Sequence, residues 1–242
     1  MQYLFCLHHA GGNSYAFQEL QRHLDKNIQL VTLDLPGHGR RIKEPLLSDI
    51  HDMSSDLFSQ IKSKLSNPYG IYGHSMGGLL GFMLIHQIRH HSLLMPRHLW
   101  ISSTKAPEFK YEDGAHLLFG NEFYHKIIHT YGGLPEELMK EKELLDFFEP
   151  IIRADFQAVE TFQYHKYPKL NIPFTVILGS NEKSVTTEQA RAWQNETSIP
   201  ITFKQFSGNH FFIFQHLADI GKLISIGMQS HSSAKKTDFP PE

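Results

Sequence analysis

Short apolar runs alternate along this chain with longer stretches in which apolar residues recur every three or four positions. The short runs predict β-strands, which we place at residues 3–7, 29–35, 69–72, 98–102, 174–178 and 201–206. The longer stretches predict helices at residues 14–26, 50–65, 79–91, 187–193 and 211–226. Strands that alternate with helices in this way indicate an α/β protein with a mostly parallel sheet flanked by helices.

The alternation breaks between the fourth and fifth predicted strands, over about residues 106–165. This segment contains no convincing strand, and three of its stretches are predicted to be helices: 119–131, 135–148 and 150–164. A wholly helical insertion between two strands of a parallel sheet is typical of a lid over the site at the end of the sheet. We therefore predict a single domain over residues 1–228 that includes this lid. Residues 229–242 are polar and without periodicity, and we expect them to form a disordered tail.

Composition places the chain among ordinary globular proteins. Its 242 residues suffice for one large domain, and its net charge of −2 gives no reason to expect nucleic acid or an anionic membrane as a partner. Cys6, the only cysteine, lies in a predicted strand and is expected to be a core residue; the lack of internal disulfides favours the cytoplasm. No apolar run approaches the ~20 residues of a membrane span, and the early first strand leaves no room for a signal peptide.

The chain also contains 17 histidines, which is a high number. Their spacing matches none of the ligand patterns that are typical of metal sites. We therefore expect no metal site and no cofactor.

The most informative motif is Gly73-His74-Ser75-Met76-Gly77, which lies between a predicted strand and a predicted helix. Three fixed letters occur by chance in about one chain in ten of this length, so the motif depends on this context. In a G-x-S-x-G elbow the turn from strand to helix is so tight that larger side chains beside the serine would clash. The serine hydroxyl is then exposed at the top of the sheet, which makes Ser75 the candidate nucleophile.

A serine nucleophile needs a base that takes its proton and an acid that orients the base. In α/β-hydrolases the three residues follow in the order serine, carboxylate, histidine, with the last two on loops after late strands. His210 lies between the last predicted strand and the last predicted helix and is the candidate base. Glu182 is the only acid in the loop after the preceding strand and is the candidate acid, with Asp155 as its main rival and Asp34 as a more distant one.

An oxyanion hole needs two backbone donors that point at the developing negative charge. The N–H of Met76, the residue after the nucleophile, is the first candidate. The second should come from the loop after an early strand, where His9-Ala10-Gly11-Gly12 is a glycine-rich segment. We predict that Ala10 N–H is the second donor, although the same glycines also suit a simple turn.

Several segments together resemble the type II thioesterases of nonribosomal peptide and polyketide assembly lines, a branch of the α/β-hydrolases. The resemblance covers residues 3 to about 215 and rests on residues 4–13, 34–41, 73–78, 102–107, 132–135, 153–156 and 208–212. The segment Arg153-Ala154-Asp155-Phe156, combined with the late Gly208-Asn209-His210-Phe211-Phe212, distinguishes this family from ordinary lipases and esterases.

The resemblance implies an α/β-hydrolase that removes acyl or aminoacyl groups from the phosphopantetheine arm of a carrier protein, through an acyl-enzyme on Ser75. It implies no cofactor, because the pantetheine belongs to the substrate. The family usually has aspartate at the position of Glu182, and Asp155 is then a structural residue of the lid, paired with Arg153 or another base. The carrier protein is the implied partner, and we expect the enzyme to be a cytoplasmic monomer.

Two other functions remain open. A small-molecule carboxylesterase or lipase would use the same triad, and a non-catalytic binding module would keep only the scaffold. The intact set of Ser75, His210 and a loop acid argues against the second of these.

Two further groups of residues have two interpretations each. Arg40, Arg41 and Lys43 would suit the docking of an acidic carrier protein, or they form an ordinary solvated loop. The apolar residues of the lid would line an acyl pocket, or they pack the lid helices onto the sheet; they are Leu117, Leu118, Phe119, Phe123, Phe147 and Phe148.

Overall fold

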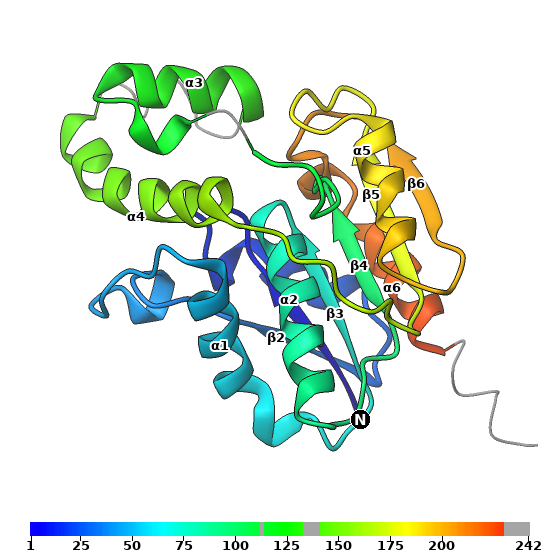
Figure 1. The fold of residues 1–242 in the computed structure, drawn as a ribbon. Coiled ribbons are helices and arrows are strands. Elements are labelled where there is room, and N and C mark those ends of the chain that lie inside the picture. Colours follow the sequence, from blue (N-terminus) through cyan, green and yellow to red (C-terminus); the bar gives the residue numbers. More distant parts are fainter. Residues whose placement is uncertain (112–113, 133–140, 230–242) are drawn as a thin grey trace, which may run out of the picture.

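The computed structural model describes residues 1–111, 114–132 and 141–229, and it contains one parallel sheet. The strands of the sheet are β1 (Gln2–Leu7), β2 (Ile28–Thr32), β3 (Tyr69–His74), β4 (Leu99–Ser102), β5 (Phe174–Gly179) and β6 (Thr202–Phe206). Their order is β2-β1-β3-β4-β5-β6, and every neighbouring pair is parallel (Figure 1). The carboxyl ends of parallel strands meet at one edge of a sheet, which is where such folds hold their sites.

Helices cover both faces of the sheet, as predicted. Those on one face are α1 (Ile50–Ile61), α2 (Met76–His90) and α5 (Thr187–Arg191), and those on the other are η1 (Ser14–His23) and α6 (Leu217–Gln229). The alternation of β1 explains this arrangement, because Phe5 and Leu7 pack on the α1 and α2 side whereas Leu4 and Cys6 pack on the η1 and α6 side. Cys6 is therefore a buried core residue. No helix in the described ranges is long and apolar enough to cross a membrane.

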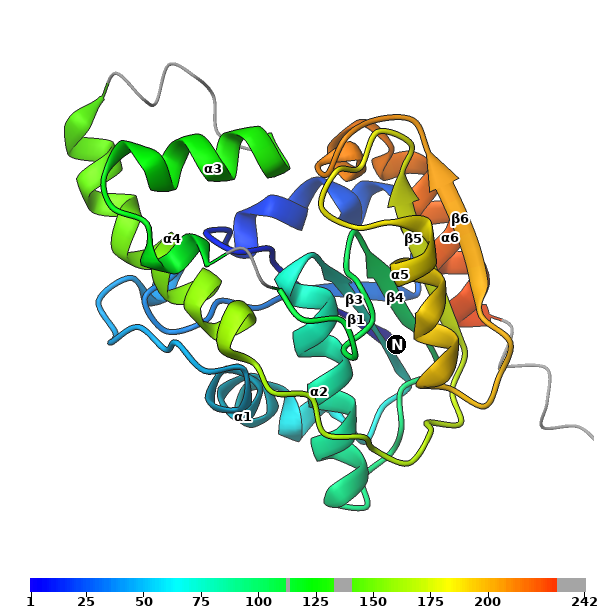
Figure 2. The same ribbon diagram turned by 45° about the horizontal axis from the view of Figure 1, so that its top comes forward.

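Between β4 and β5 the chain forms a helical insertion. Its described elements are η4 (Ala115–Leu117), α3 (Asn121–Tyr131) and α4 (Lys142–Thr161). In two views, α3 and α4 lie beyond the carboxyl ends of the strands rather than against either face of the sheet (Figures 1 and 2). The predicted start of a helix at residue 135 lies outside the described residues, as do residues 230–242 of the expected tail; Gln229 itself ends α6.

The predicted break between two helices at Pro150 is wrong, because α4 continues through this residue. A proline inside a helix lacks the N–H that would bond to the carbonyl four residues earlier, and this usually ends the helix. Here the turns after Pro150 are held by tertiary packing, since Ile151, Ile152 and Phe156 are all buried. Burial of this face outweighs the local preference.

Other predicted elements also differ from the structure in type or length, among them two that lie between β1 and residue 41. The segment after the first strand forms the 3₁₀ helix η1 rather than an α-helix, and it is capped by Asn13, whose side chain accepts a hydrogen bond from Tyr15 N. The second strand ends at Thr32, so residues 33–35 belong to the loop that follows it. This loop includes Asp34 and leads to η2 (Gly39–Arg41).

Candidate active site

Ser75 occupies the turn between β3 and α2. Its backbone has φ +56° and ψ −121°, a conformation that residues other than glycine rarely adopt. Two hydrogen bonds hold this turn: Ser75 N donates to Ser102 O at 2.8 Å, and Thr104 Oγ1 donates to Ser75 O at 2.7 Å. A Cβ atom on Gly73 would lie 2.1 Å from the carbonyl oxygen of Gly77, and one on Gly77 would lie 2.2 Å from the backbone of β1. The motif therefore forms the tight elbow that the sequence predicts.

His210 and Glu182 lie on the loops after β6 and β5, and their side chains form a hydrogen bond. His210 Nδ1 is 2.8 Å from Glu182 Oε2, and both side chains are almost fully buried. Glu182 Oε1 also accepts from the N–H and the hydroxyl of Ser184, at 2.9 and 2.8 Å. Burial alone would raise the pKa of Glu182, but the hydrogen bond and the charge interaction with His210 lower it to about 2. Glu182 is thus ionised at neutral pH, and His210 Nδ1–H donates to it.

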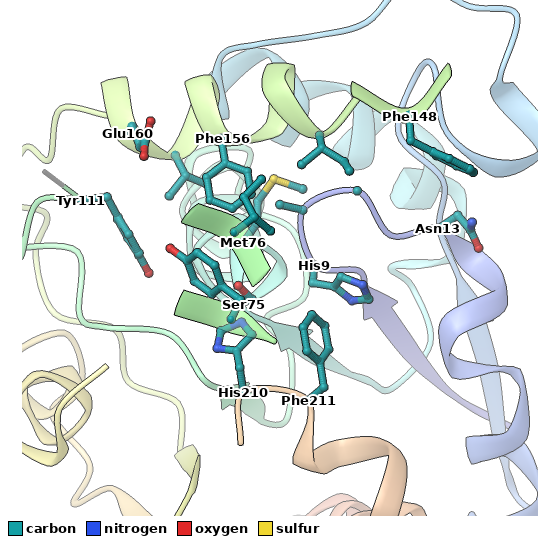
Figure 3. Close-up of a pocket in the computed structure, with 16 residues that line it drawn as sticks. His9, Asn13, Ser75, Met76, Tyr111, Phe148, Phe156, Glu160, His210 and Phe211 are labelled. Atoms are coloured by element: carbon teal, nitrogen blue, oxygen red, sulfur yellow. The ribbon is translucent and has the colours of Figure 1, made fainter. Parts of the chain in front are cut away.

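Ser75 and His210 line the same cavity at the carboxyl end of the sheet (Figure 3). Because His210 Nδ1 is engaged with Glu182, Nε2 is the ring nitrogen left for Ser75. The described residues form no hydrogen bond between Ser75 Oγ and His210 Nε2, and such bonds often tighten only when substrate binds. The imidazole is held from two further sides by Tyr131 and Phe211, whose ring centroids lie 4.9 and 5.2 Å from it.

The two predicted oxyanion donors lie beside the same cavity. Met76 is the first residue of α2, and the first N–H groups of a helix have no partner within it. Ala10 lies in the turn after β1, which is closed by a hydrogen bond of 2.9 Å from Gly12 N to His9 O. Both Met76 and Ala10 line the cavity, and neither N–H donates to another described residue. Both backbone donors are therefore available to a ligand.

The cavity has a volume of about 300 Å³ and lies beneath the insertion. Its wall on the insertion side consists of apolar and aromatic residues of α3 and α4: Ile127, Tyr131, Phe148, Ile152, Phe156 and Val159. Polar side chains lie at its two ends, with Tyr111 and Glu160 at one end and Asn13 at the other (Figure 3). The space next to Ser75 therefore suits an apolar group of moderate size.

The apolar lid residues that the sequence analysis named divide into three groups. Phe148 lines the cavity, and Phe123 is buried in a small core within the insertion, against which Leu118 packs. The other three are exposed by 52–84% of their surface and neither line the cavity nor pack on the sheet: Leu117, Phe119 and Phe147. Neither interpretation therefore holds for the whole set, because only some of these residues face inward.

Asp155, the rival candidate for the triad acid, is fully buried on α4 but does not contact His210. Its Oδ2 accepts from Gly11 N at 2.7 Å and lies 3.0 Å from His38 Nε2. His38 is not among the site residues predicted from the sequence, although it belongs to one of the segments on which the family resemblance rests. His38 and Asp155 are 117 residues apart, so no local sequence pattern indicates that they form a pair.

Of the two partners expected for Asp155, Arg153 or another base, the structure shows the second, because Asp155 faces His38 and not Arg153. Arg153 forms its ion pair with Glu149 and donates to the backbone carbonyls of His116 and Leu118, at 2.6 Å each. The two residues are separated by only one position on α4, and residues at this spacing point to different sides of a helix. Arg153 therefore holds the insertion together, whereas Asp155 reaches the loops of the sheet.

Asp34, the third candidate acid, is also bonded away from His210. It accepts from Arg40 Nε at 3.1 Å and from the backbone and hydroxyl of Ser14 at 2.7 and 2.9 Å. Arg41 is similarly paired with Asp56 and with Glu44. Both loop arginines are thus neutralised by acids of this chain, which weakens the interpretation of the loop as a basic docking surface.

His9 and His74 contribute no positive charge beside Ser75. Burial and neighbouring histidines lower the pKa of His9 to about 3 and that of His74 well below its ordinary value. His74 Nδ1 lies 2.8 Å from Ser102 Oγ, so this histidine takes part in the support of the elbow. Within the described part of the chain, no three or more His, Cys, Asp or Glu side chains are grouped to hold a metal ion.

Comparison with known proteins gives consistent matches over nearly the whole chain. A family model described as "Thioesterase domain" matches residues 2–226. Linear gramicidin dehydrogenase LgrE of Brevibacillus parabrevis is 32% identical over 232 residues, which cover 94% of this chain and 88% of that protein.

Solved structures show the same relationship. ClbQ from the colibactin NRPS/PKS pathway has a TM-score of 0.90 and 29% identity, covering 96% of this chain and 98% of that one. The type II thioesterase BorB from the borrelidin biosynthetic cluster has a TM-score of 0.83 and 28% identity, covering 94% and 91%.

Proposed function

This chain belongs to the thioesterase family and has the α/β-hydrolase fold, and we propose that it hydrolyses acyl or aminoacyl thioesters on the phosphopantetheine arm of carrier proteins. One observation carries the proposal: Ser75, a histidine bonded to a buried carboxylate, and two unengaged backbone N–H groups all border one apolar cavity. Acyl transfer to a serine needs this combination of nucleophile, base and oxyanion donors.

The first half of the reaction transfers the acyl group to Ser75. His210 Nε2 accepts the Ser75 proton as Oγ attacks the thioester carbonyl carbon, and the carbonyl oxygen becomes negatively charged. Met76 N–H and Ala10 N–H stabilise this oxyanion. The carbon–sulfur bond then breaks, and a thiolate leaves readily because a thiol has a pKa near ~8.5. The thiolate takes up the proton from His210, which is therefore neutral again before the second half.

The second half returns the enzyme to its starting state. His210 takes a proton from water, which attacks the acyl-Ser75 carbonyl carbon. The same two N–H groups stabilise the second oxyanion, and the proton passes from His210 to Ser75 Oγ as the acid leaves. Glu182 holds the Nδ1–H of His210 throughout and stabilises the imidazolium that forms in both halves. No cofactor takes part, because the pantetheine arm belongs to the substrate.

The carrier protein enters this proposal through the relatives. ClbQ is described as part of an NRPS/PKS pathway, and BorB as a type II thioesterase of a biosynthetic cluster. Type II thioesterases of such pathways act on substrates bound to carrier proteins. In this chain the insertion would serve as a lid, and outward movement of α3 and α4 would admit the long arm. One relative is named a dehydrogenase, but this sequence has no G-x-G-x-x-G dinucleotide segment, so we do not extend that activity to it.

The test compares carrier-bound acyl thioesters with p-nitrophenyl esters of the same acids, using the wild type, Ser75→Ala and the exposed control Ser59→Ala. We expect faster hydrolysis of the carrier-bound thioester, a loss of at least ~10³-fold in kcat for Ser75→Ala, and no change for Ser59→Ala. Faster hydrolysis of the small esters would favour the carboxylesterase alternative. Undiminished thioester hydrolysis by Ser75→Ala would overturn the mechanism.

A further inference from the structure

Asp155 is a buried carboxylate of the insertion that the proposed mechanism does not use. It lies in the middle of α4, its side chain is fully inaccessible, and it does not line the cavity. Burial of an ionised carboxylate is costly unless hydrogen bonds and an opposite charge compensate it. The partners of Asp155 therefore indicate what this residue does.

Both partners lie on loops of the sheet, far from α4 in the sequence. A single oxygen, Oδ2, accepts from Gly11 N at 2.7 Å and faces His38 Nε2 at 3.0 Å. Gly11 belongs to the loop after β1, and His38 belongs to the loop after β2. Asp155 thus ties the insertion to two loops at the carboxyl end of the sheet.

The hydrogen bonds of His38 favour its positively charged form. Its Nδ1 lies 3.0 Å from Pro36 O, a carbonyl oxygen that can only accept, so Nδ1 donates. Its Nε2 faces the carboxylate of Asp155, which accepts when it is ionised, and in that state both ring nitrogens carry a proton. Burial lowers the pKa of His38, but the hydrogen bond and the charge of Asp155 raise it further, with a smaller contribution from Asp34. The ring of His8 packs 5.0 Å from that of His38 and remains neutral, since burial and the charge of His38 lower its pKa.

The loop that Asp155 holds contains the proposed oxyanion donor. Ala10 lies between two anchored peptide groups: Gly12 N donates to His9 O at 2.9 Å, and Gly11 N donates to Asp155. The same segment packs tightly under α4, because a Cβ on Gly11 would lie 2.7 Å from the side chain of Ile152. The direction of the Ala10 N–H is therefore set by contacts on both sides of this residue.

We propose that Asp155 and His38 form a positioning pair, which holds the Ala10–Gly11 loop so that Ala10 N–H points toward the carbonyl oxygen bound at Ser75. The inference rests on the proposed function, because it assigns the pair a role in forming the oxyanion hole. In this proposal the insertion both covers the cavity and supports the loop that contains Ala10. The mutual neutralisation of carboxylate and imidazolium keeps net negative charge away from the place where the oxyanion forms.

The kinetic test compares Asp155→Ala, Asp155→Asn and His38→Gln with the wild type. Asp155→Ala removes the acceptor for Gly11 N–H, and we expect kcat to fall about 10- to 100-fold with KM changed by less than about twofold, since loss of one oxyanion donor costs 10²–10³-fold. Asp155→Asn retains an acceptor oxygen of the same shape, so its kcat should fall only about three- to tenfold. Tyr124→Phe is the matched control, because it removes one buried hydrogen bond of the insertion, to Leu145 O, and should stay within about twofold of the wild type.

A spectroscopic readout separates positioning from general destabilisation. The amide proton of Gly11 should resonate downfield in the wild type and move upfield in Asp155→Asn, because a hydrogen bond to a neutral amide is weaker than one to a carboxylate. If Asp155→Ala does not fold, Asp155→Asn and His38→Gln still test the proposal. A wild-type kcat in both of these folded variants, or a loss that appears only in KM, would overturn the proposal.

Labelling of Ser75 by a fluorophosphonate distinguishes failure of this inference from failure of the proposed function. The probe needs the nucleophile and the oxyanion hole but no thioester. If the wild type is labelled yet does not hydrolyse carrier-bound thioesters, the proposed function fails, and a slower labelling of Asp155→Ala still supports the positioning pair. Equal labelling rates in the wild type and Asp155→Ala contradict the positioning pair even if the thioesterase activity is present.

Discussion

Two buried carboxylate–histidine pairs lie near Ser75, and they differ in what the second nitrogen of the imidazole does. In the pair of Glu182 and His210, Nδ1 bonds to the carboxylate and Nε2 has no partner among the described residues. In the pair of Asp155 and His38, one nitrogen bonds to the carboxylate and the other to the carbonyl of Pro36. A histidine with both nitrogens bonded has none left with which to exchange a proton with a nucleophile.

The two pairs also differ in where they sit. His210 lines the cavity with Ser75, whereas Asp155 and His38 lie behind the loop that carries Ala10. The comparison teaches that a buried carboxylate bonded to a histidine does not by itself indicate catalysis. From the free nitrogen and the shared cavity we propose proton transfer for the first pair, and from the backbone contact to Gly11 we propose support for the second.

The largest expected difference between the pairs appears when each carboxylate is replaced by its amide. Glu182→Gln should lower kcat for carrier-bound thioesters about 100- to 1,000-fold, because an amide neither fixes the right tautomer of His210 nor stabilises its imidazolium. Asp155→Asn should lower kcat only about three- to tenfold, since it retains the acceptor for Gly11 N–H. Steady-state kinetics of both variants measure this directly.

Glu188→Gln, a change of an exposed acid on α5, serves as the control and should behave as the wild type. The assignment of the two pairs would be reversed if Asp155→Asn lost far more activity than Glu182→Gln while both variants remained folded.

A smaller difference should appear in the pH dependence of stability. The Glu182 pair should lose its contribution at acid pH, and the His38 pair should lose its contribution at alkaline pH. The pKa of Glu182 is lowered from 4.5 to about 2, so its contribution is present above pH 4.5 and is lost as the pH falls toward 2. The pKa of His38 is raised above 6.5, so its contribution is present below pH 6.5 and is lost as the pH rises through the higher folded value. At about 1.4 kcal/mol per pKa unit, the shift of the Glu182 pKa corresponds to about 3 kcal/mol of stability.

Urea unfolding of the wild type, Glu182→Gln and His38→Gln from pH 3 to pH 9 measures these contributions. The difference in free energy of unfolding between the wild type and Glu182→Gln should become smaller as the pH falls. The difference between the wild type and His38→Gln should become smaller as the pH rises. Gaps that stay constant over the whole range would show that neither pair changes its protonation on unfolding.

The two pairs also show which parts of the site can be predicted from the sequence. The elbow at Ser75 has a local signal, because glycines at fixed offsets and a strand before a helix are all visible in one stretch. His210 and Glu182 could be named from the order of strands, since the loops after parallel strands meet at one edge of the sheet. The fold class was confirmed for the same reason, as it depends only on the alternation of strands and helices.

The partner of Asp155 could not be named in this way. The expectation of Arg153 or another base leaves this partner open, whereas the actual contacts join α4 to loops 117 and 144 residues away. The helix through Pro150 was missed for a related reason, because tertiary burial of Ile151 and Ile152 overrides the local preference of proline. In both cases long-range packing decides the outcome.

The central claim, that Ser75 accepts an acyl group from a carrier-bound thioester, is tested most directly by rapid-quench mass spectrometry of the wild-type protein mixed with an acyl-loaded carrier protein. We predict a transient mass increase of one acyl group on the peptide that contains Ser75, which decays at the rate at which free acid appears. Free acid that forms at the full rate without any acylation of this peptide would contradict the account.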